Sequence, residues 1–178
     1  MTFPKAYADV VQRFRVPGGF LLLGSFVVFS EPTMSSVLWG LPLSLIGMLI
    51  RVWAAGHLAK NEDLAQSGPY GHVRNPLYLG SLFLAGGLVY GGRSWVVLGI
   101  FLGAFLLIYL PVIQLEEEHL RKLFASYGEY ASRVPALVPV VRGRGASKQF
   151  RWELFRRNKE WKAMLGYLFG LGWLLWRI

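Results

Sequence analysis

The chain has 178 residues, of which 54% are apolar and only 16% carry a charge. Because a water-soluble domain usually has about 25% charged residues, this composition argues against one. The chain contains no cysteine, which excludes disulfides, thiolate metal sites and cysteine nucleophiles. Its three histidines lack metal-binding spacing, so we expect no catalytic metal. The formal net charge of +9 suits anionic lipid head groups, since most basic residues flank apolar segments or lie in one tail.

Apolar segments predict an all-α membrane protein. They cover, in chain order, residues 17–30, 34–55, 77–90, 94–115 and 163–176. A helix needs about 20 apolar residues to cross the hydrocarbon layer, and the second and fourth segments reach this length. The other three need flanking residues or a re-entrant path. We therefore expect an integral membrane helical bundle with about five transmembrane helices, folded as a single domain over residues 1–178.

The distribution of lysine and arginine predicts the orientation in the membrane. These residues gather in the segments 5–15, 60–74 and 121–162, whereas the two opposite loops hold only Arg93. Cytoplasmic loops of membrane proteins carry an excess of lysine and arginine. The pattern predicts a multi-pass protein with a cytoplasmic N-terminus, and the absence of cysteine together with the compact, prokaryote-like chain fits the plasma (inner) membrane. The loop after the second apolar segment and the long segment after the fourth would then share the cytoplasmic side.

The first polar segment with chemical interest is SGPYGHVRNPLYLG at residues 67–80. A Gly-Pro turn signal is followed by Asn75-Pro76, which marks a helix start with proline at the first helical position. A helix start offers free N–H groups and a partial positive charge to an anionic or polar ligand, and Tyr70 and Arg74 lie beside it. An ordinary interfacial turn, with a snorkelling arginine and a tyrosine in the aromatic belt, is the alternative.

The second polar segment is the run of three glutamates from Glu116 to Glu118, which we expect at the cytoplasmic end of a long helix. A helix C-terminus prefers cations, and adjacent carboxylates repel one another unless a cation or a donor group lies among them. The position therefore indicates a partner, and only one or two of the carboxylates can face a shared pocket. The alternative is a helix that continues into water with ion pairs at helical spacing.

The two polar segments belong to an ordered set of motifs over about residues 50–140. The motifs are GPY at 68–70, RNPLYLG at 74–80, Glu-Glu-x-x-Leu at 116–120, and Phe124, Tyr127 and Tyr130 followed by RVP at 133–135. The set resembles the superfamily of isoprenylcysteine carboxyl methyltransferases and phospholipid methyltransferases, as a bacterial-type member. The resemblance implies an integral membrane methyltransferase that binds S-adenosyl-L-methionine in a cytoplasmic pocket and releases S-adenosyl-L-homocysteine.

The resemblance also assigns roles to individual residues. It implies that the cofactor is bound by Glu62, Ala65, Tyr70, Arg74, Asn75, Pro76, Leu77, Tyr78 and Glu116. Glu116 would face the ammonium group of the cofactor, and Glu117 would support it. Two positions depart from the family pattern: Asn75 replaces the common histidine, and Val112 stands where eukaryotic carboxyl methyltransferases have the arginine that engages the substrate carboxylate. The resemblance therefore supports methyl transfer more than any particular acceptor.

Ionisable residues near the end of the second apolar segment are further candidates. Arg51 lies within a predicted membrane segment, where an ionisable group is by default a functional candidate, although snorkelling explains it equally well. His57 could act as a general base near neutral pH or be a hydrogen-bonded interfacial histidine. If the acceptor must lose a proton, we expect His57, His72 or the catalytic candidate Glu117 to take it.

The C-terminal part of the chain carries a basic segment, residues 140–162, with four interleaved aromatic side chains. Beside membrane helices, this texture favours an interfacial segment on anionic lipid over a nucleic-acid site. Residues 163–176 would follow as a C-terminal hydrophobic helix.

The predicted function is the transfer of a methyl group from S-adenosyl-L-methionine to a lipophilic acceptor that is isoprenoid, prenylated or phospholipid-like. A lipophilic acceptor fits the predicted membrane setting, because a water-soluble one gains nothing from it. The alternatives are an NADPH-binding membrane reductase related to sterol reductases and a non-catalytic membrane scaffold. The sequence gives no indication of the oligomeric state.

Overall fold

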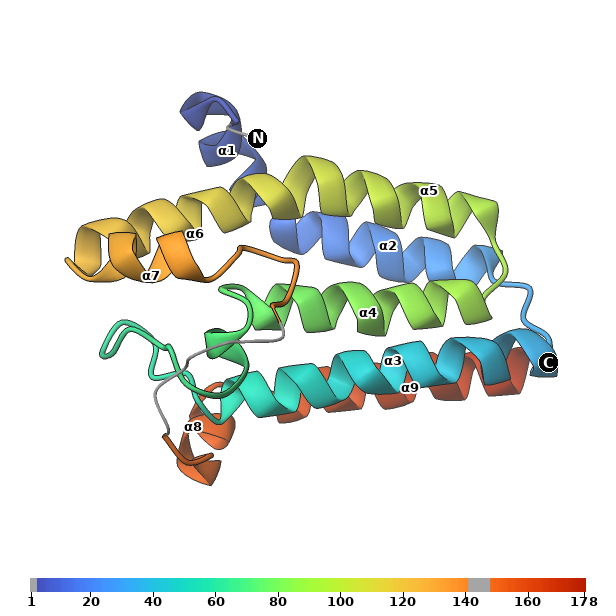
Figure 1. Cartoon of the computed structure of the whole chain (residues 1–178). Helices are drawn as coiled ribbons and strands as arrows, with labels where there is room; N and C mark the ends of the chain where they lie inside the picture. The colour runs from blue at the N-terminus through green and yellow to red at the C-terminus, as the bar shows by residue number, and fades with distance from the viewer. Residues whose placement is uncertain (1–2, 141–147) are drawn as a thin grey trace.

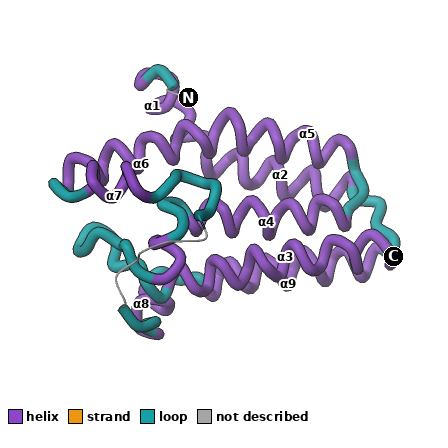
Figure 2. Tube along the Cα trace, in the orientation of Figure 1, coloured by secondary structure: helices purple, strands orange, loops and turns teal. Residues whose placement is uncertain are grey.

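The computed structural model describes residues 3–140 and 148–178, and within these ranges every regular element is helical (Figure 2). The all-α prediction is confirmed for this part of the chain, whereas residues 141–147 of the predicted basic segment lie outside it. The elements are α1 (Lys5–Val11), η1 (Gln12–Phe14), α2 (Arg15–Phe29), α3 (Met34–Ala55), η2 (Gly68–Gly71), α4 (Pro76–Gly91), α5 (Trp95–Ala104), η3 (Phe105–Tyr109), α6 (Leu110–Leu123), α7 (Tyr127–Arg133), α8 (Trp152–Arg157) and α9 (Trp161–Arg177).

The bundle is made of α2, α3, α4, α9 and the long helix formed by α5, η3 and α6, which lie side by side with similar axis directions (Figure 1). α3 has the predicted bounds, and α4 begins at Pro76, where proline at the first helical position predicts a start. Within residues 3–140 and 148–178, two helices are long and apolar enough to cross a bilayer, Met34–Ala55 and Trp95–Leu123. α4 is apolar but shorter, so five complete spans stay a prediction.

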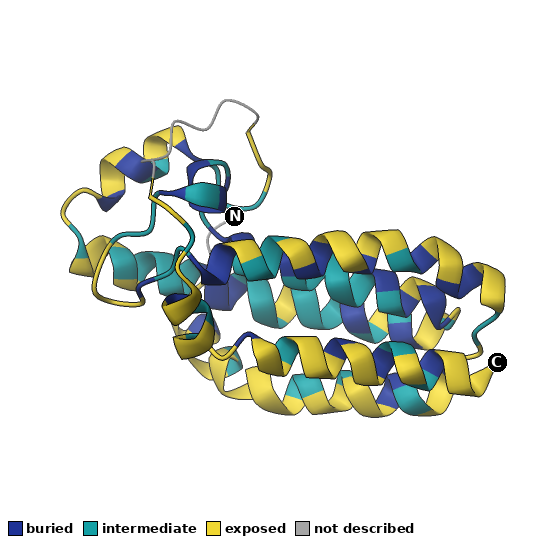
Figure 3. Cartoon of the chain, turned by 90° about the horizontal axis from the view of Figure 1, so that it is seen from below, coloured by how far each residue is buried: buried dark blue, intermediate teal, exposed yellow. Residues whose placement is uncertain are grey.

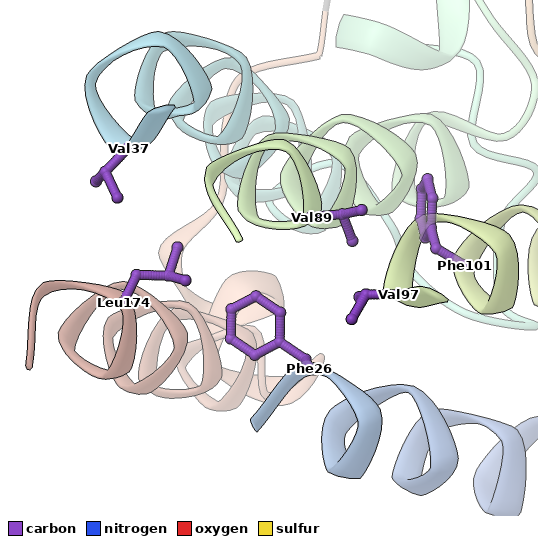
Figure 4. Close-up of a cluster of buried hydrophobic side chains, with 6 residues drawn as sticks. All are labelled: Phe26, Val37, Val89, Val97, Phe101 and Leu174. Atoms are coloured by element: carbon purple, nitrogen blue, oxygen red, sulfur yellow. The ribbon is translucent and has the colours of Figure 1, made fainter. Parts of the chain in front are cut away.

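One apolar cluster joins the bundle helices at the end where the C-terminus lies (Figures 1 and 4). Its members are Phe26, Val37, Val89, Val97, Phe101 and Leu174. The outer faces of the helices are largely exposed (Figure 3) and carry large apolar side chains, such as Trp39 at 73% and Leu49 at 67% exposure. Soluble monomers rarely expose large apolar patches, so this surface is suited to lipid.

Glycines allow α3 and α4 to pack with their backbones in contact. A Cβ atom added to Gly47 would lie 2.2 Å from the backbone nitrogen of Leu84, and one added to Gly40 would lie 2.3 Å from the carbonyl oxygen of Gly87. Small residues at such positions are a common basis of close helix packing in membranes. The contact places the end of α3 beside the start of α4, so that Arg51 reaches the first turn of α4.

The long helix Trp95–Leu123 contains a π-helical turn at Phe105–Tyr109. Residue 111 is a proline, so it has no N–H for the Leu107 carbonyl, its partner in a regular α-helix. The hydroxyl of Tyr7 donates to this carbonyl instead, at 2.8 Å. The π-helical turn therefore lies where a proline interrupts the α-helical hydrogen bonds, at a point where α1 packs against the helix.

The same helix extends eight residues beyond the predicted end at residue 115. The glutamate run therefore lies inside α6 rather than at a helix C-terminus, which corrects the prediction about its position. Contacts with distant segments support this polar part of the helix. The side-chain amide of Gln114 exchanges hydrogen bonds with the backbone of Phe3, at 2.7 and 3.1 Å, and Glu117 binds Arg74.

Candidate active site

A cavity of about 1100 Å³ opens at the end of the bundle opposite the C-terminus. Its walls come from the end of α3, one side of α6, the starts of α2 and α4, and α7. The short elements η1, η2 and η3, the loop at residues 58–65 and the turn between α8 and α9 complete them. The predicted site residues that line it are Ala65, Tyr70, Arg74, Asn75, Pro76, Leu77, Tyr78 and Glu116. The structure thus brings most of the predicted cofactor residues to one place. His57, Glu62 and Glu117 do not line this cavity.

Tyr78 and Glu116 form the polar contact on the wall of this cavity. Tyr78 is buried in the first turn of α4, and its hydroxyl donates to Glu116 Oε1 at 2.9 Å. Arg15 Nη1 lies 3.4 Å from the same oxygen, and its guanidinium lies 5.5 Å from the centre of the Tyr78 ring. The Glu116 side chain is 45% exposed, so the carboxylate is held in place yet open to a ligand. Tyr109 packs edge-on against Tyr78, with ring centres 6.1 Å apart.

Arg15 is a cavity residue that the sequence reasoning missed. In the sequence, Arg15 is only one of several basic residues before the first apolar segment. Nothing in the local pattern distinguishes it from Arg13. Its partner Glu116 is 101 residues away along the chain. No local signal in a single sequence could have joined the two.

Glu117 is engaged by three donors of the protein itself. Arg74 binds it with two parallel hydrogen bonds, Nε to Oε1 at 2.9 Å and Nη2 to Oε2 at 2.8 Å, and Asn75 Nδ2 adds a third at 2.8 Å. Arg74 Nη1 also donates to the carbonyls of Ala131 and Val134, each at 2.8 Å. The Arg74–Glu117 pair therefore joins the start of α4 to α6 and α7. The predicted proton-accepting role stays a prediction, with this carboxylate already committed to Arg74 and Asn75.

The pKa of Arg74 lies above its ordinary value. Burial alone lowers the pKa of this guanidinium, but the hydrogen bonds and the negative charge of Glu117 outweigh burial. Arginine remains charged in any case, so Arg74 brings a fixed positive charge to the wall of the cavity.

His57 and Glu62 lie elsewhere. His57 Nδ1 is 2.9 Å from the Trp53 carbonyl and Nε2 is 3.2 Å from the Lys148 carbonyl. The ring lines a second cavity, of about 210 Å³. Glu62 is exposed and forms an ion pair with Arg157. The structure therefore does not bring these two residues to the Tyr78–Glu116 contact.

Three tyrosines line another part of the large cavity. Tyr70, Tyr127 and Tyr130 are all buried, and the Tyr130 hydroxyl donates to the Tyr70 carbonyl at 2.7 Å. Burial raises the pKa of Tyr70 and Tyr130 above the ordinary value, and burial followed by the charge of Glu117 raises the pKa of Tyr127 to about 12. All three hydroxyls are therefore protonated at neutral pH and can donate. Among the described residues, the buried Tyr127 hydroxyl has no hydrogen-bond partner.

Tyr127 and Tyr130 offer a matched pair of substitutions. Tyr127→Phe should leave the free energy of unfolding unchanged or raise it by up to about 1 kcal/mol, because it removes an unpaired buried hydroxyl. Tyr130→Phe should lower it by about 1 kcal/mol, because it removes a made hydrogen bond. Denaturant unfolding in detergent measures both values. An equal loss in the two variants would show that the Tyr127 hydroxyl has a partner in the ligand-free protein.

A second missed contact joins Arg51 to the C-terminal part of the chain. Arg51 Nε lies 3.0 Å from Glu160 Oε2, and Nη2 lies 2.8 Å from Glu160 Oε1. Both residues line the large cavity. Glu160 was not predicted as a site residue, because it lies in the basic segment that we expected at the lipid interface. Two features of the sequence could have indicated this contact. Glu160 is an acidic residue just before an apolar segment, and Arg51 lies without a predicted partner inside another apolar segment.

The family-level prediction is confirmed. The chain matches the family model described as phospholipid methyltransferase over residues 35–127, and it belongs to that family. Membership in this family suggests a membrane methyltransferase.

Two curated relatives carry names that refer to metal resistance. The chain is 34% identical over 124 residues to the cobalt-zinc-cadmium resistance protein CzcN of Cupriavidus metallidurans, covering 68% of this chain and 51% of the relative. It is 32% identical over 129 residues to the nickel-cobalt-cadmium resistance protein NccN of Alcaligenes xylosoxydans xylosoxydans, covering 71% of this chain and 54% of the relative. The chain thus spans about half the length of the curated relatives it matches. No solved structure matches it significantly.

Proposed function

We propose that this chain is a membrane methyltransferase that binds S-adenosyl-L-methionine and methylates a lipophilic acceptor. The observation that carries the proposal is the Glu116 carboxylate, which Tyr78 holds on the wall of a large cavity in a member of the phospholipid methyltransferase family. A half-exposed carboxylate of this kind is suited to an ammonium group. The names of the relatives leave the acceptor of this chain open.

The cavity has the size and the lining that the cofactor needs. Ligand pockets commonly measure about 300–1,000 Å³, and this one, at about 1100 Å³, has room for a nucleoside and an acceptor group together. Leu58, Leu64 and Pro76 add apolar surface that suits an adenine ring.

The residues of the chain act by binding, orienting and excluding water. The cofactor, when bound, supplies an electrophilic methyl group on a sulfonium ion. Transfer of that group needs alignment in a dry site rather than a metal or a covalent nucleophile. Tyr78 and Arg15 keep the Glu116 carboxylate at one place on the wall. If the acceptor must lose a proton, His119 lines the cavity and is better placed to take it than His57.

We propose further that the chain is one membrane-embedded domain in the inner membrane, with the cavity facing the cytoplasm. The two long apolar helices and the exposed apolar side chains support insertion. Of the described basic residues, Arg93 and Arg177 belong to the opposite end of the bundle, whereas Lys60, Arg74 and Arg121 belong to the cavity end. Basic residues at the cavity end suit anionic head groups on the cytoplasmic side.

Binding of S-adenosyl-L-homocysteine to detergent-purified protein tests the cofactor. We expect saturable binding in calorimetry, weakened about ten- to a hundredfold by Tyr78→Ala and by Glu116→Gln, because a hydrogen bond to a charged group contributes about 1.5–3 kcal/mol. Glu129→Gln is the control, since Glu129 is exposed and, within the described ranges, forms its ion pair with Arg133. It should bind like the wild type.

Two results would overturn this proposal. Well-folded protein that binds NADPH but no S-adenosyl-L-homocysteine would favour the reductase alternative. Protein that binds neither, and whose Tyr78 and Glu116 variants change only stability, would favour a non-catalytic scaffold.

A further inference from the structure

We propose that the C-terminal segment, residues 151–178, is part of the ligand site rather than only an anchor. In this proposal Glu160 is a positioning residue: through Arg51 it holds the first turn of α4, which carries Tyr78. The identity of the ligand rests on the function proposed above, whereas the positioning of α4 does not. The segment lies outside residues 35–127, which match the family model.

The Arg51 guanidinium connects three helices. Two of its nitrogens bind Glu160 at the start of α9, as described above, and Nη1 donates to the Leu77 carbonyl at 3.3 Å and to the Ser81 hydroxyl. The Ser81 hydroxyl also donates to the Leu77 carbonyl, at 2.8 Å. Leu77 directly precedes Tyr78. The charge of Glu160 is thus linked by two contacts to the turn that holds the Glu116 carboxylate.

The C-terminal segment is docked on the end of α3. Asn158 Nδ2 donates to the carbonyls of Ala55 and Leu58, each at 2.9 Å, and the backbone nitrogen of Arg151 donates to the Gly56 carbonyl at 3.0 Å. Carbonyls at a helix end need such partners. A Cβ atom added to Gly56 would lie 2.2 Å from the Phe150 ring, so this contact is close. The predicted interfacial segment therefore contacts the end of α3 at Arg151 and Asn158, and the helix α8 within it has six residues.

Two features favour a positioning role over a purely stabilising one. The side chains of Arg51 and Glu160 are only 19% and 8% exposed, and a buried ion pair is often no more stabilising than apolar residues of similar volume. Lys159, next to Glu160, has a left-handed backbone with φ of 56°, which is uncommon outside glycine. Backbone conformations of this kind are often retained at functional sites.

Hydrogen exchange of the ligand-free protein tests the positioning of α4 without any cofactor. Glu160→Ala should speed amide exchange several-fold in the first turns of α4, residues 77–81. Glu153→Ala is the matched control, because Glu153 lies in the same segment, is exposed and pairs with Arg151. It should leave exchange in these residues unchanged.

A double variant, Arg51→Met with Glu160→Leu, separates positioning from stability. It removes both charges together, so the melting temperature should stay near that of the wild type. The first turn of α4 nevertheless loses the guanidinium, so its exchange should rise and affinity for S-adenosyl-L-homocysteine should fall about tenfold, within the range of typical coupling between sites.

The outcomes distinguish this inference from the proposed function. Wild-type exchange and wild-type affinity in the double variant would overturn the positioning role. If the wild type binds no S-adenosyl-L-homocysteine, the proposed cofactor is wrong, and exchange in residues 77–81 still decides whether Glu160 positions α4.

Discussion

Gly47→Leu should prevent the chain from folding into a stable bundle. A Cβ atom at this position meets the backbone of Leu84 at 2.2 Å and the Gly80 carbonyl at 2.5 Å, and backbone atoms cannot turn aside as a side-chain end can. Overpacking a core usually costs about 1–3 kcal/mol and occasionally more, and this contact belongs at the upper end. We expect little monodisperse protein after size-exclusion chromatography in detergent, and a large fall in melting temperature for what remains.

Gly99→Leu is the control for this substitution. Gly99 is an exposed glycine in α5, and no atom lies within 4 Å of an added Cβ. The same change should therefore be tolerated there, since leucine has a better helix propensity than glycine by up to about 1 kcal/mol. Equal melting temperatures for the two variants would contradict a close contact between α3 and α4.

Removing either partner of the Arg74–Glu117 pair should destabilise the protein by about 3–5 kcal/mol, because the partner left behind is a largely buried charge with no opposite charge beside it. The side chains are 15% and 19% exposed. Arg74→Ala also frees the carbonyls of Ala131 and Val134. The expected loss is therefore greatest around α7, and limited proteolysis should cut there before the bundle unfolds. Chemical denaturation in detergent measures the global value.

Two comparisons test whether burial explains this effect. Glu129→Ala breaks an exposed pair with Arg133, at 56% and 75% exposure, and should cost no more than about 1 kcal/mol. Arg74→Met combined with Glu117→Leu should destabilise less than either single alanine variant. A double variant that loses as much as the sum of the two single losses would rule out a penalty from an unpaired charge.

The helices were predictable because their signals are local. Apolar length locates α3, and proline at the first helical position locates the start of α4. The extension of the long helix to Leu123 was not predictable in this way, because its polar part is supported by Phe3 and Arg74, which are distant in sequence. Periodicity and hydropathy are local properties and do not predict such long-range contacts.

The residues of the candidate site also differ in whether a local signal predicts them. Tyr70, Asn75, Tyr78 and Glu116 lie in motifs with fixed spacing, and the structure places all four on one cavity. Glu160 depends on a partner 109 residues away, so no motif includes it. For the same reason the location of the His57 ring, which contacts Lys148, could not be deduced from its neighbours.

The π-helical turn at Phe105–Tyr109 is a position where a related chain could lose one residue and keep the same fold. A π-helical turn holds about one residue more than an α-helical turn. Deleting one residue there would convert the π-helical turn into an α-helical turn ahead of Pro111, and α5 could still face α2 and α6 could still face α1. The deletion would nevertheless redirect Tyr109, which lines the cavity against Tyr78. A relative with a one-residue gap at this turn would therefore keep the bundle and present a different cavity wall to its ligand.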